Sequence, residues 1–265
     1  MAHNEQVKNL RVGLMPYLNS EVFYRNLPAE RTVLVSLPPR AMAAAVERGE
    51  LDAGPLPLAE VVRLGEMLRP VGDFCIATSG RVKSVLLLTR VPVGQLGGMP
   101  VAVTSHTATS IQLLRVLFAE RWHVHPGSYV EINEPHEAKL IIGDEALRYR
   151  KDHPGYGHIY DLGEEWQNLT GLPFVFAVWA MRTGCEAQSS AGLASALERS
   201  INISLTQVDA ISRERKTSYL TEAEVAEYVR SFTYRLGPEE YRAMDEFKAR
   251  LSRLPAWRPA LVPQV

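Results

Sequence analysis

Short apolar runs alternate along the chain with longer segments in which apolar residues recur at helical spacing. The short runs have the length of strands and are bounded by Gly, Pro and polar residues, which indicates β-strands. These runs lie at residues 12–15, 32–37, 51–58, 74–78, 85–89, 101–103, 129–132, 139–142 and 172–182. The first run ends at Pro16, because proline lacks the amide that would continue a sheet ladder.

Helical periodicity fills most of the intervals between these runs. Residues 39–48 begin with proline and are followed by Gly49, the usual order at the two ends of a helix. Apolar residues at 111, 114, 117 and 118 form one face of another helix, and GDEAL at 143–147 opens a third. From residue 187 onward the pattern is almost wholly helical. Strands and helices in alternation predict an α/β fold.

The order of these segments predicts two lobes. A linker rich in glycine and proline at residues 91–99 starts a second α/β unit, and the run at 172–182 can return the chain to the first unit. We expect a first lobe from residues 1–90 plus 180–265 and an inserted second lobe from residues 91–179. A weak internal repeat supports this division, since GELDAGPLPL and EAKLIIGDEAL each run from a charged helix end through a short strand to a turn. Paired lobes of this kind close over a small molecule.

Composition and charge exclude several classes of function. The chain has 265 residues, is 46% hydrophobic and carries a formal net charge of -1, which argues against a nucleic-acid partner. Cys75 and Cys185 are the only cysteines and have no metal-ligand spacing. GxSxG, Walker, HExxH and GxGxxG motifs are also missing, so we expect neither a metal nor an organic cofactor.

The sequence does not point to a membrane or to export. The first ten residues, MAHNEQVKNL, lack the apolar core of a secretion signal. The longest apolar run, residues 172–181, is too short to span a bilayer. We therefore expect a cytoplasmic protein that binds a small molecule. A homodimer through the C-terminal helices stays open, although apolar stripes of this kind more often face the core of their own chain.

The turn after the first strand carries three polar candidates. In open α/β sheets, ligands bind beyond the carboxyl ends of strands, where the next helix also presents unpaired amides. Tyr17, Asn19 and Ser20 follow the first strand and are expected to reach such a site. Alternatively, Asn19 only caps the following helix, which is a common role of asparagine.

The strongest candidate loop is TSHTATS at residues 104–110, between a strand and a helix. Its hydroxyls belong to Thr104, Ser105, Thr107, Thr109 and Ser110. Hydroxyls and the first amides of a helix are neutral donors that suit a carboxylate or a phosphate. A helix cap alone would need one hydroxyl, so we favour anion binding. His106 is the one histidine in a candidate loop, and we favour a bystander over a base.

Two other loops carry weaker candidates. In the loop at residues 79–84, we prefer Ser84 to Arg81 or Lys83, because exposed cations on loops are mostly solvated. Asp144 stands at the start of a predicted helix, where an acid is most often a cap and a catalytic role is the minority interpretation. We include Asp144 among the residues expected to contact the ligand.

Six segments occur in a specific order along nearly the whole chain. They are PYLNS at 16–20, GELDAGPLPLAE at 49–60, SGRVKSVLLLT at 79–89, the pair Thr109 and Ser110 at a helix start, LIIGDEAL at 140–147, and YDLGEEWQNLTGLPFVFAVW at 160–179. Together they resemble the menaquinone-biosynthesis chorismate dehydratases. Val22 departs from the pattern, because we expect proline there in many relatives, and this leaves the start of the first helix open.

The resemblance implies a fold and a reaction. The fold would be like that of the type II periplasmic binding proteins, with a ligand cleft between two lobes, in a cytoplasmic enzyme of the futalosine route to menaquinone. The enzyme would be a hydro-lyase that removes water from chorismate and gives 3-[(1-carboxyvinyl)oxy]benzoate. Removal of the proton at the ring carbon bearing the ether, followed by loss of the neighbouring hydroxyl, yields an aromatic ring, and aromatisation supplies driving force.

The resemblance also suggests roles for the candidate residues. Asn19 and Ser84 would position chorismate from the first lobe, and Ser105, Thr109 and Ser110 would hold a carboxylate from the second lobe. The base is unassigned, and the side-chain carboxylate of chorismate itself could take the proton.

Two alternatives remain. The related 1,4-dihydroxy-6-naphthoate synthase shares the fold, but we expect a catalytic histidine in its second lobe, and GDEAL shows none. A non-catalytic binding protein or sensor is the other class, and the small number of catalytic groups favours it. The missing export signal and the missing DNA-binding domain argue against it.

Overall fold

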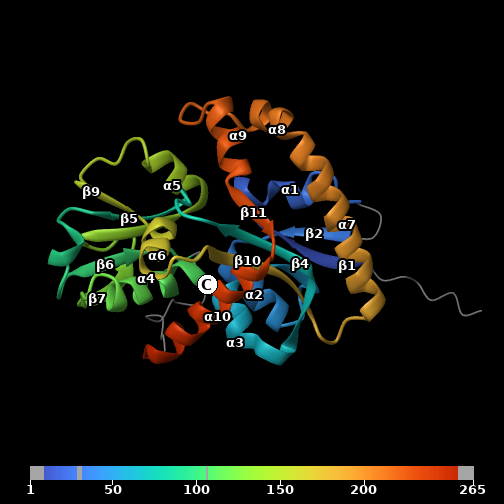
Figure 1. The fold of residues 1–265 in the computed structure, drawn as a ribbon, viewed down its shortest axis with the longest axis horizontal. Helices are drawn as coiled ribbons and strands as arrows, with labels where there is room; N and C mark the ends of the chain where they lie inside the picture. The colour runs from blue at the N-terminus through green and yellow to red at the C-terminus, as the bar shows by residue number, and fades with distance from the viewer. Residues whose placement is uncertain (1–8, 29–31, 106, 256–265) are drawn as a thin grey trace, which may run out of the picture.

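The strands of the computed structural model form two sheets, one in each lobe (Figure 1). The structure describes residues 9–28, 32–105 and 107–255. The first sheet contains β1 (Leu10–Leu14), β2 (Thr32–Ser36), β3 (Ala53–Pro57), β4 (Leu68–Thr78), β10 (Phe174–Arg182) and β11 (Phe232–Arg235), in the order β11-β4-β10-β3-β1-β2. The second sheet contains β5 (Val85–Thr89), β6 (Pro100–Val103), β7 (Ser128–Glu131), β8 (Ala138–Ile142) and β9 (His158–Asp161), in the order β7-β6-β8-β5-β9.

Helices pack on both sheets, as an α/β fold requires. In Figure 1 the second lobe lies on the left with α4 (Thr109–Glu120), α5 (Gly143–Tyr149) and α6 (Leu162–Thr170). The other α-helices are α1 (Glu21–Tyr24), α2 (Pro39–Glu47), α3 (Leu58–Leu64), α7 (Ala187–Thr206), α8 (Val208–Arg215), α9 (Glu222–Arg230) and α10 (Pro238–Arg253). Short 3-10 helices lie at η1 (Leu18–Ser20), η3 (Gly65–Met67) and η4 (Val93–Gln95). The predicted helix at residues 39–48 is confirmed by α2, which begins at Pro39.

The two sheets divide the chain at places that differ from the predicted lobe boundaries. β5 falls within residues 1–90, yet it pairs antiparallel with β8 and β9 in the second sheet. All five residues of β5 are buried, and a partner on each edge satisfies its backbone groups. Conversely, β10 begins within the predicted second lobe of residues 91–179, yet from Phe174 onward it pairs with β4 of the first sheet. Sheet membership therefore changes within residues 79–84 and again within residues 162–173.

Both sheets contain parallel strands whose carboxyl ends lead toward the space between the lobes. β1 pairs parallel with β2 and β3, and β6 pairs parallel with β7 and β8. The chain leaves β1 toward η1, β3 toward α3, β6 toward α4 and β8 toward α5. Ligands of open α/β sheets bind at such ends, so this topology places the loops predicted from the sequence at one site.

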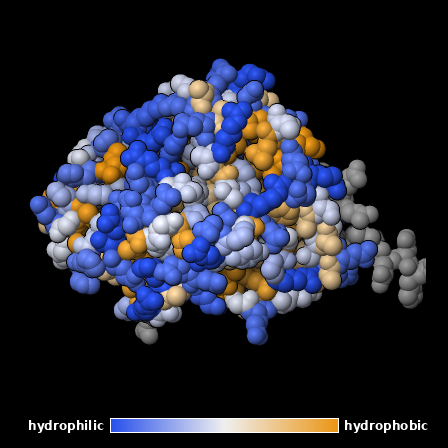
Figure 2. Space-filling model, viewed as in Figure 1, coloured by the Kyte–Doolittle hydropathy of each residue, from blue (hydrophilic) through white to orange (hydrophobic). Residues whose placement is uncertain are grey.

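The apolar stripe of the C-terminal helix faces its own chain. Phe247 of α10 is fully buried and packs edge-to-face on Trp166 and Phe174, with ring centroids 6.0 and 5.1 Å away. This stripe is therefore used within the chain, and a homodimer stays a prediction. Figure 2 shows one face on which hydrophilic side chains predominate and apolar ones gather in small separate patches. Among the helices of the described ranges, none is both long and apolar enough to cross a membrane.

Candidate active site

A cavity of about 520 Å³, counting its part open to solvent, lies where the strand ends of the two lobes meet. Its polar lining comes from Tyr17, Asn19, Ser84, Thr107, Thr109 and Ser110. Its apolar lining includes Met15, Ile76, Val82, Val85, Ile142 and Phe176. Side chains predicted from three separate loops are therefore brought together in one cavity.

Ser20 shapes the turn that presents Tyr17 and Asn19, and it does not line the cavity. Its hydroxyl lies 2.7 Å from the carbonyl oxygens of both Met15 and Tyr17, and the residue is fully buried. The hydroxyl of Tyr24 accepts a hydrogen bond from the amide of Met15 at 3.1 Å. These bonds hold the chain directly after β1 in one shape, so the role of Ser20 here is structural.

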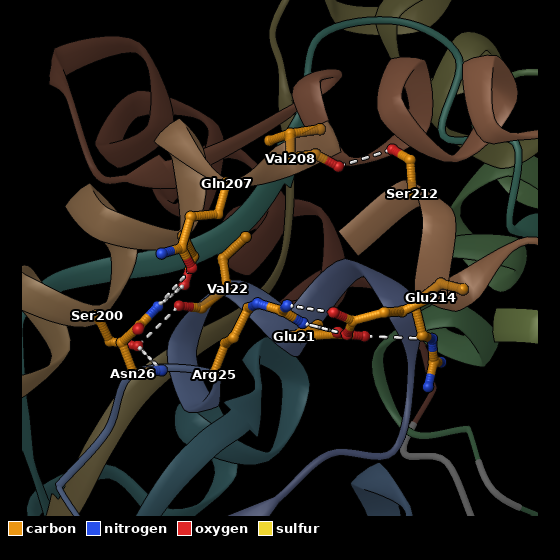
Figure 3. Close-up of polar contacts among 11 residues, drawn as sticks. Glu21, Val22, Arg25, Asn26, Ser200, Gln207, Val208, Ser212 and Glu214 are labelled. Carbon is orange, nitrogen blue, oxygen red and sulfur yellow. Dashed lines mark hydrogen bonds and ion pairs between the residues drawn. The ribbon is translucent and has the colours of Figure 1, made fainter. Parts of the chain in front are cut away.

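The first helix, α1, is anchored to α7 and α8 (Figure 3). The Ser200 hydroxyl of α7 donates to the carbonyl of Val22 at 3.0 Å and accepts from the amide of Asn26 at 3.1 Å. Arg25 forms two hydrogen bonds of 2.6 Å with the carboxylate of Glu214 at the end of α8. Val22 is the second residue of α1 and is fully buried. The helix therefore begins at Glu21, with valine and not proline as its second residue.

Two buried oxygen atoms in the cavity lining have no hydrogen-bond partner among the described residues. They are Oδ1 of Asn19, from the first lobe, and Oγ1 of Thr107, from the second. Buried polar atoms in folded proteins are nearly always paired, because an unpaired one loses its bond to water without replacement. Both atoms can be satisfied by a ligand in the cavity.

The N-terminus of α4 opens into the same cavity. Thr107, Ala108, Thr109 and Ser110 all line it, and Ala108 provides no side-chain cap for the first amides of this helix. Uncapped amides at a helix start attract anions. The hydroxyl oxygen of Thr109 accepts a hydrogen bond of 3.2 Å from the amide of Ala59 in α3, so it also joins the two lobes. The arrangement can hold a carboxylate with neutral donors.

None of the described residues that line the cavity is an acid, a histidine, a lysine or an arginine. Tyr17 is the one phenol there, and burial, reinforced by the nearby charges of Asp144 and Glu145, raises its pKa to about 12. Tyr17 is therefore neutral at ordinary pH. His106 lies outside the described residues.

Two predicted contact residues lie away from the cavity. Ser105 is exposed in the loop before α4 and does not line the cavity. Asp144 lies in a neighbouring pocket, where its Oδ1 accepts from the amide of Leu18 at 3.4 Å and its Oδ2 is 3.6 Å from Nη2 of Arg215. An acid at the start of α5 therefore joins the two lobes beside the cavity.

The cations of the loop before β5 are paired elsewhere, while Ser84 faces the cavity. Arg81 forms an ion pair with Glu164 at 2.9 Å, and Lys83 with Glu227 at 2.6 Å. Ser84 is 1% exposed, and its oxygen accepts a hydrogen bond of 2.7 Å from the hydroxyl of Tyr228 in α9. Tyr228 was not predicted from the sequence, because a tyrosine at an apolar helical position is typical of the protein core.

The described residues contain no group of three or more His, Cys, Asp or Glu side chains arranged to hold a metal ion. Within this part of the chain, the candidate chemistry is that of hydroxyls, an amide side chain and backbone amides.

Comparison with known proteins finds a matching family model and several related sequences. A family model described as "Menaquinone biosynthesis" matches residues 10–253. "Chorismate dehydratase" from Thermus thermophilus is 29% identical over 190 residues, which cover 64% of this chain and 69% of that relative. "1,4-dihydroxy-6-naphtoate synthase" from Streptomyces coelicolor is 29% identical over 224 residues, which cover 75% of this chain and 74% of that relative.

Solved structures share the fold. The crystal structure of an Archaeoglobus fulgidus protein matches with a TM-score of 0.76 at 16% identity, covering 94% of this chain and 98% of that one. The periplasmic aliphatic sulphonate binding protein of Escherichia coli matches with a TM-score of 0.58 at 16% identity, covering 91% of each chain. The predicted two-lobed α/β fold, like that of periplasmic binding proteins, is confirmed.

Proposed function

The chain belongs to the menaquinone biosynthesis family, and we propose that its reaction is the elimination of water from chorismate to give 3-[(1-carboxyvinyl)oxy]benzoate. The observation that carries this proposal is a cavity whose described lining combines apolar side chains with uncharged polar ones, with unpaired oxygens on Asn19 and Thr107 and an uncapped helix start. Such a site suits an anionic substrate in which one of its own carboxylates acts as the base.

Carboxylate binding is assigned to the second lobe. The first amides of α4 and the hydroxyls of Thr109 and Ser110 would hold one carboxylate of chorismate. Charge that develops on the ring carboxylate as the proton leaves would be stabilised by donors already oriented before the reaction. Asn19 would position the ring from the first lobe and Ser84 from the segment that crosses between the lobes, so that closure of the lobes fixes both ends of the substrate.

The role of the base is assigned to the substrate itself. The side-chain carboxylate of chorismate would take the proton from the ring carbon that bears the ether. The electron pair of that bond enters the ring diene and the ring carboxylate, and the hydroxyl on the neighbouring carbon then leaves. The departing hydroxyl takes up a proton, so that water and an aromatic ring are the products. The cavity would orient and desolvate the reacting groups.

One alternative comes from the relative in Streptomyces coelicolor, which is as identical to this chain as the chorismate dehydratase relative. We expect that reaction to use a histidine of the second lobe. The segment GDEAL at residues 143–147, where we expect that histidine, contains none, which favours the dehydratase.

The test is to incubate the purified protein with chorismate, follow the loss of diene absorbance, and identify the product by mass. We expect a product lighter than chorismate by one water. Binding of chorismate without conversion would favour a non-catalytic binding protein. If chorismate is neither bound nor converted, the proposal is wrong.

A further inference from the structure

The hydroxyl of Tyr228 is buried behind the cavity and contacts Ser84 directly. Tyr228 is 2% exposed, and its ring packs edge-to-face on Phe232 with centroids 5.0 Å apart. Its hydroxyl donates to Oγ of Ser84 at 2.7 Å. Burial raises the pKa of Tyr228 well above its ordinary value, so the phenol keeps the proton that it donates.

This bond determines where the proton of Ser84 can go. Ser84 has one hydroxyl proton, and the proton from Tyr228 already occupies one side of its oxygen. Within the described structure, the acceptor for the Ser84 proton is the carbonyl of Val82 at 3.4 Å, which is a long hydrogen bond. A substrate oxygen in the cavity can replace this weak acceptor. A hydroxyl that accepts one strong bond also becomes a better donor.

Contacts along helix α9 link Tyr228 to the segment that carries Ser84. A capping box between Thr221 and Glu224 starts the helix. Glu224 also pairs with Lys151 of the second lobe at 2.7 Å, and Glu227 pairs with Lys83 at 2.6 Å. Lys83 is the residue before Ser84, so these contacts favour the position in which Tyr228 can donate to Ser84.

We propose that Tyr228 is a positioning residue for the reaction, because it orients the Ser84 hydroxyl as a hydrogen-bond donor toward the substrate. This inference rests on the proposed function. Tyr228 does not line the cavity and acts through Ser84 alone.

The experiment is a double-mutant cycle of Tyr228→Phe and Ser84→Ala, with kcat and KM measured on chorismate. Phenylalanine keeps the buried ring and removes only the hydroxyl. We expect Tyr228→Phe to lower kcat about tenfold, the effect of one lost hydrogen bond, with a smaller change in KM. In the Ser84→Ala background, we expect Tyr228→Phe to have no further effect on kcat.

Tyr234→Phe is the matched control. Tyr234 is also buried, at 4% exposed, and its hydroxyl donates to the carbonyl of Val229 at 2.9 Å, away from the cavity. Both Phe variants should lose similar thermal stability, but only Tyr228→Phe should lose turnover. An equal loss of kcat with and without Ser84, or no loss at all, would overturn the role of Tyr228 while wild-type turnover upholds the function. Absence of wild-type turnover would overturn both.

Discussion

The ring of Tyr17 in the first lobe lies directly against Gly143 in the second lobe. A Cβ atom on Gly143 would fall 2.7 Å from both Cδ1 and Cε1 of this ring. Gly143 also has a φ of +64°, which is strained for any residue with a side chain. Its amide donates to the carbonyl of Ser84 at 2.8 Å. Glycine therefore permits the close approach of the two lobes beside the cavity.

Gly143→Ala should weaken substrate binding. The added methyl group meets the Tyr17 ring and strains the backbone, so closure of the lobes becomes less favourable. We expect KM for chorismate to rise about tenfold and stability to fall by about 1–2 kcal/mol. Gly171→Ala is the control, because Gly171 has a φ of +73° but no atom near the added Cβ. Similar KM values for the two variants would contradict a role for this contact.

Asp144→Asn should leave chemistry intact. Asp144 joins the lobes through Leu18 and Arg215 but does not line the cavity. Because exposed ion pairs are weak, we expect KM to rise only about two- to fivefold, and kcat to stay near the wild-type value. Raised salt should shrink the difference in KM. If the variant binds chorismate normally but has no turnover, Asp144 is the base and the substrate-assisted mechanism is wrong.

Asp161→Ala should destabilise the second lobe. The carboxylate accepts hydrogen bonds from the amides of Val82 at 3.0 Å, Lys83 at 2.7 Å, Gly163 at 3.0 Å and Glu164 at 3.3 Å. It therefore caps α6 and fixes Lys83 at its φ of +63°. We expect a loss of about 2–4 kcal/mol in urea unfolding. A loss within about 0.5 kcal/mol, typical of an ordinary surface site, would contradict this role.

Asp52 should make stability depend on pH in acid. Burial opposes ionisation of Asp52, but hydrogen bonds from Arg11 at 2.7 Å and Arg182 at 3.1 Å outweigh it and lower its pKa from 3.8 to about 2. Because the folded pKa lies below the unfolded one, the stabilisation is full above about pH 4 and disappears as the pH falls through about 2.

Asp52→Asn tests this linkage by urea unfolding across a pH series. We expect a loss of about 1–2 kcal/mol at pH 7, after allowance for screening by solvent around the two arginines. The difference between wild type and variant should shrink between about pH 4 and pH 2. A difference that stays constant through this interval would show that the pKa of Asp52 is not lowered by folding.

Local pattern was sufficient for much of the fold. Pro39 and Gly49 marked the ends of α2, and the buried run at residues 85–89 marked β5. Local pattern did not reveal which sheet β5 joins, because strand pairing is decided by distant segments. β11, at Phe232–Arg235, was missed within a stretch interpreted as helical, since its few residues acquire their alternating burial only by pairing with β4.

In the candidate site, too, neighbouring residues in the sequence predict some members, while contacts between distant segments could not be predicted. Asn19, Thr107 and Ser110 could be predicted, because each follows a strand or starts a helix, and all three line the cavity. The hydroxyl of Ser20 is directed to backbone carbonyls of its own turn, which composition could not reveal. Tyr228 meets Ser84 from 144 positions further along the chain, so no local pattern joins them.

The pH dependence of kcat on chorismate tests most directly the claim that this cavity removes water without a base from the protein. No described lining side chain titrates near neutrality, and carboxylates titrate near about pH 4, so we predict a flat kcat from about pH 6 to about pH 9. A kcat that falls with decreasing pH around a pKa of about 6.5, and becomes flat and low in His106→Asn, would identify a histidine base and contradict the claim.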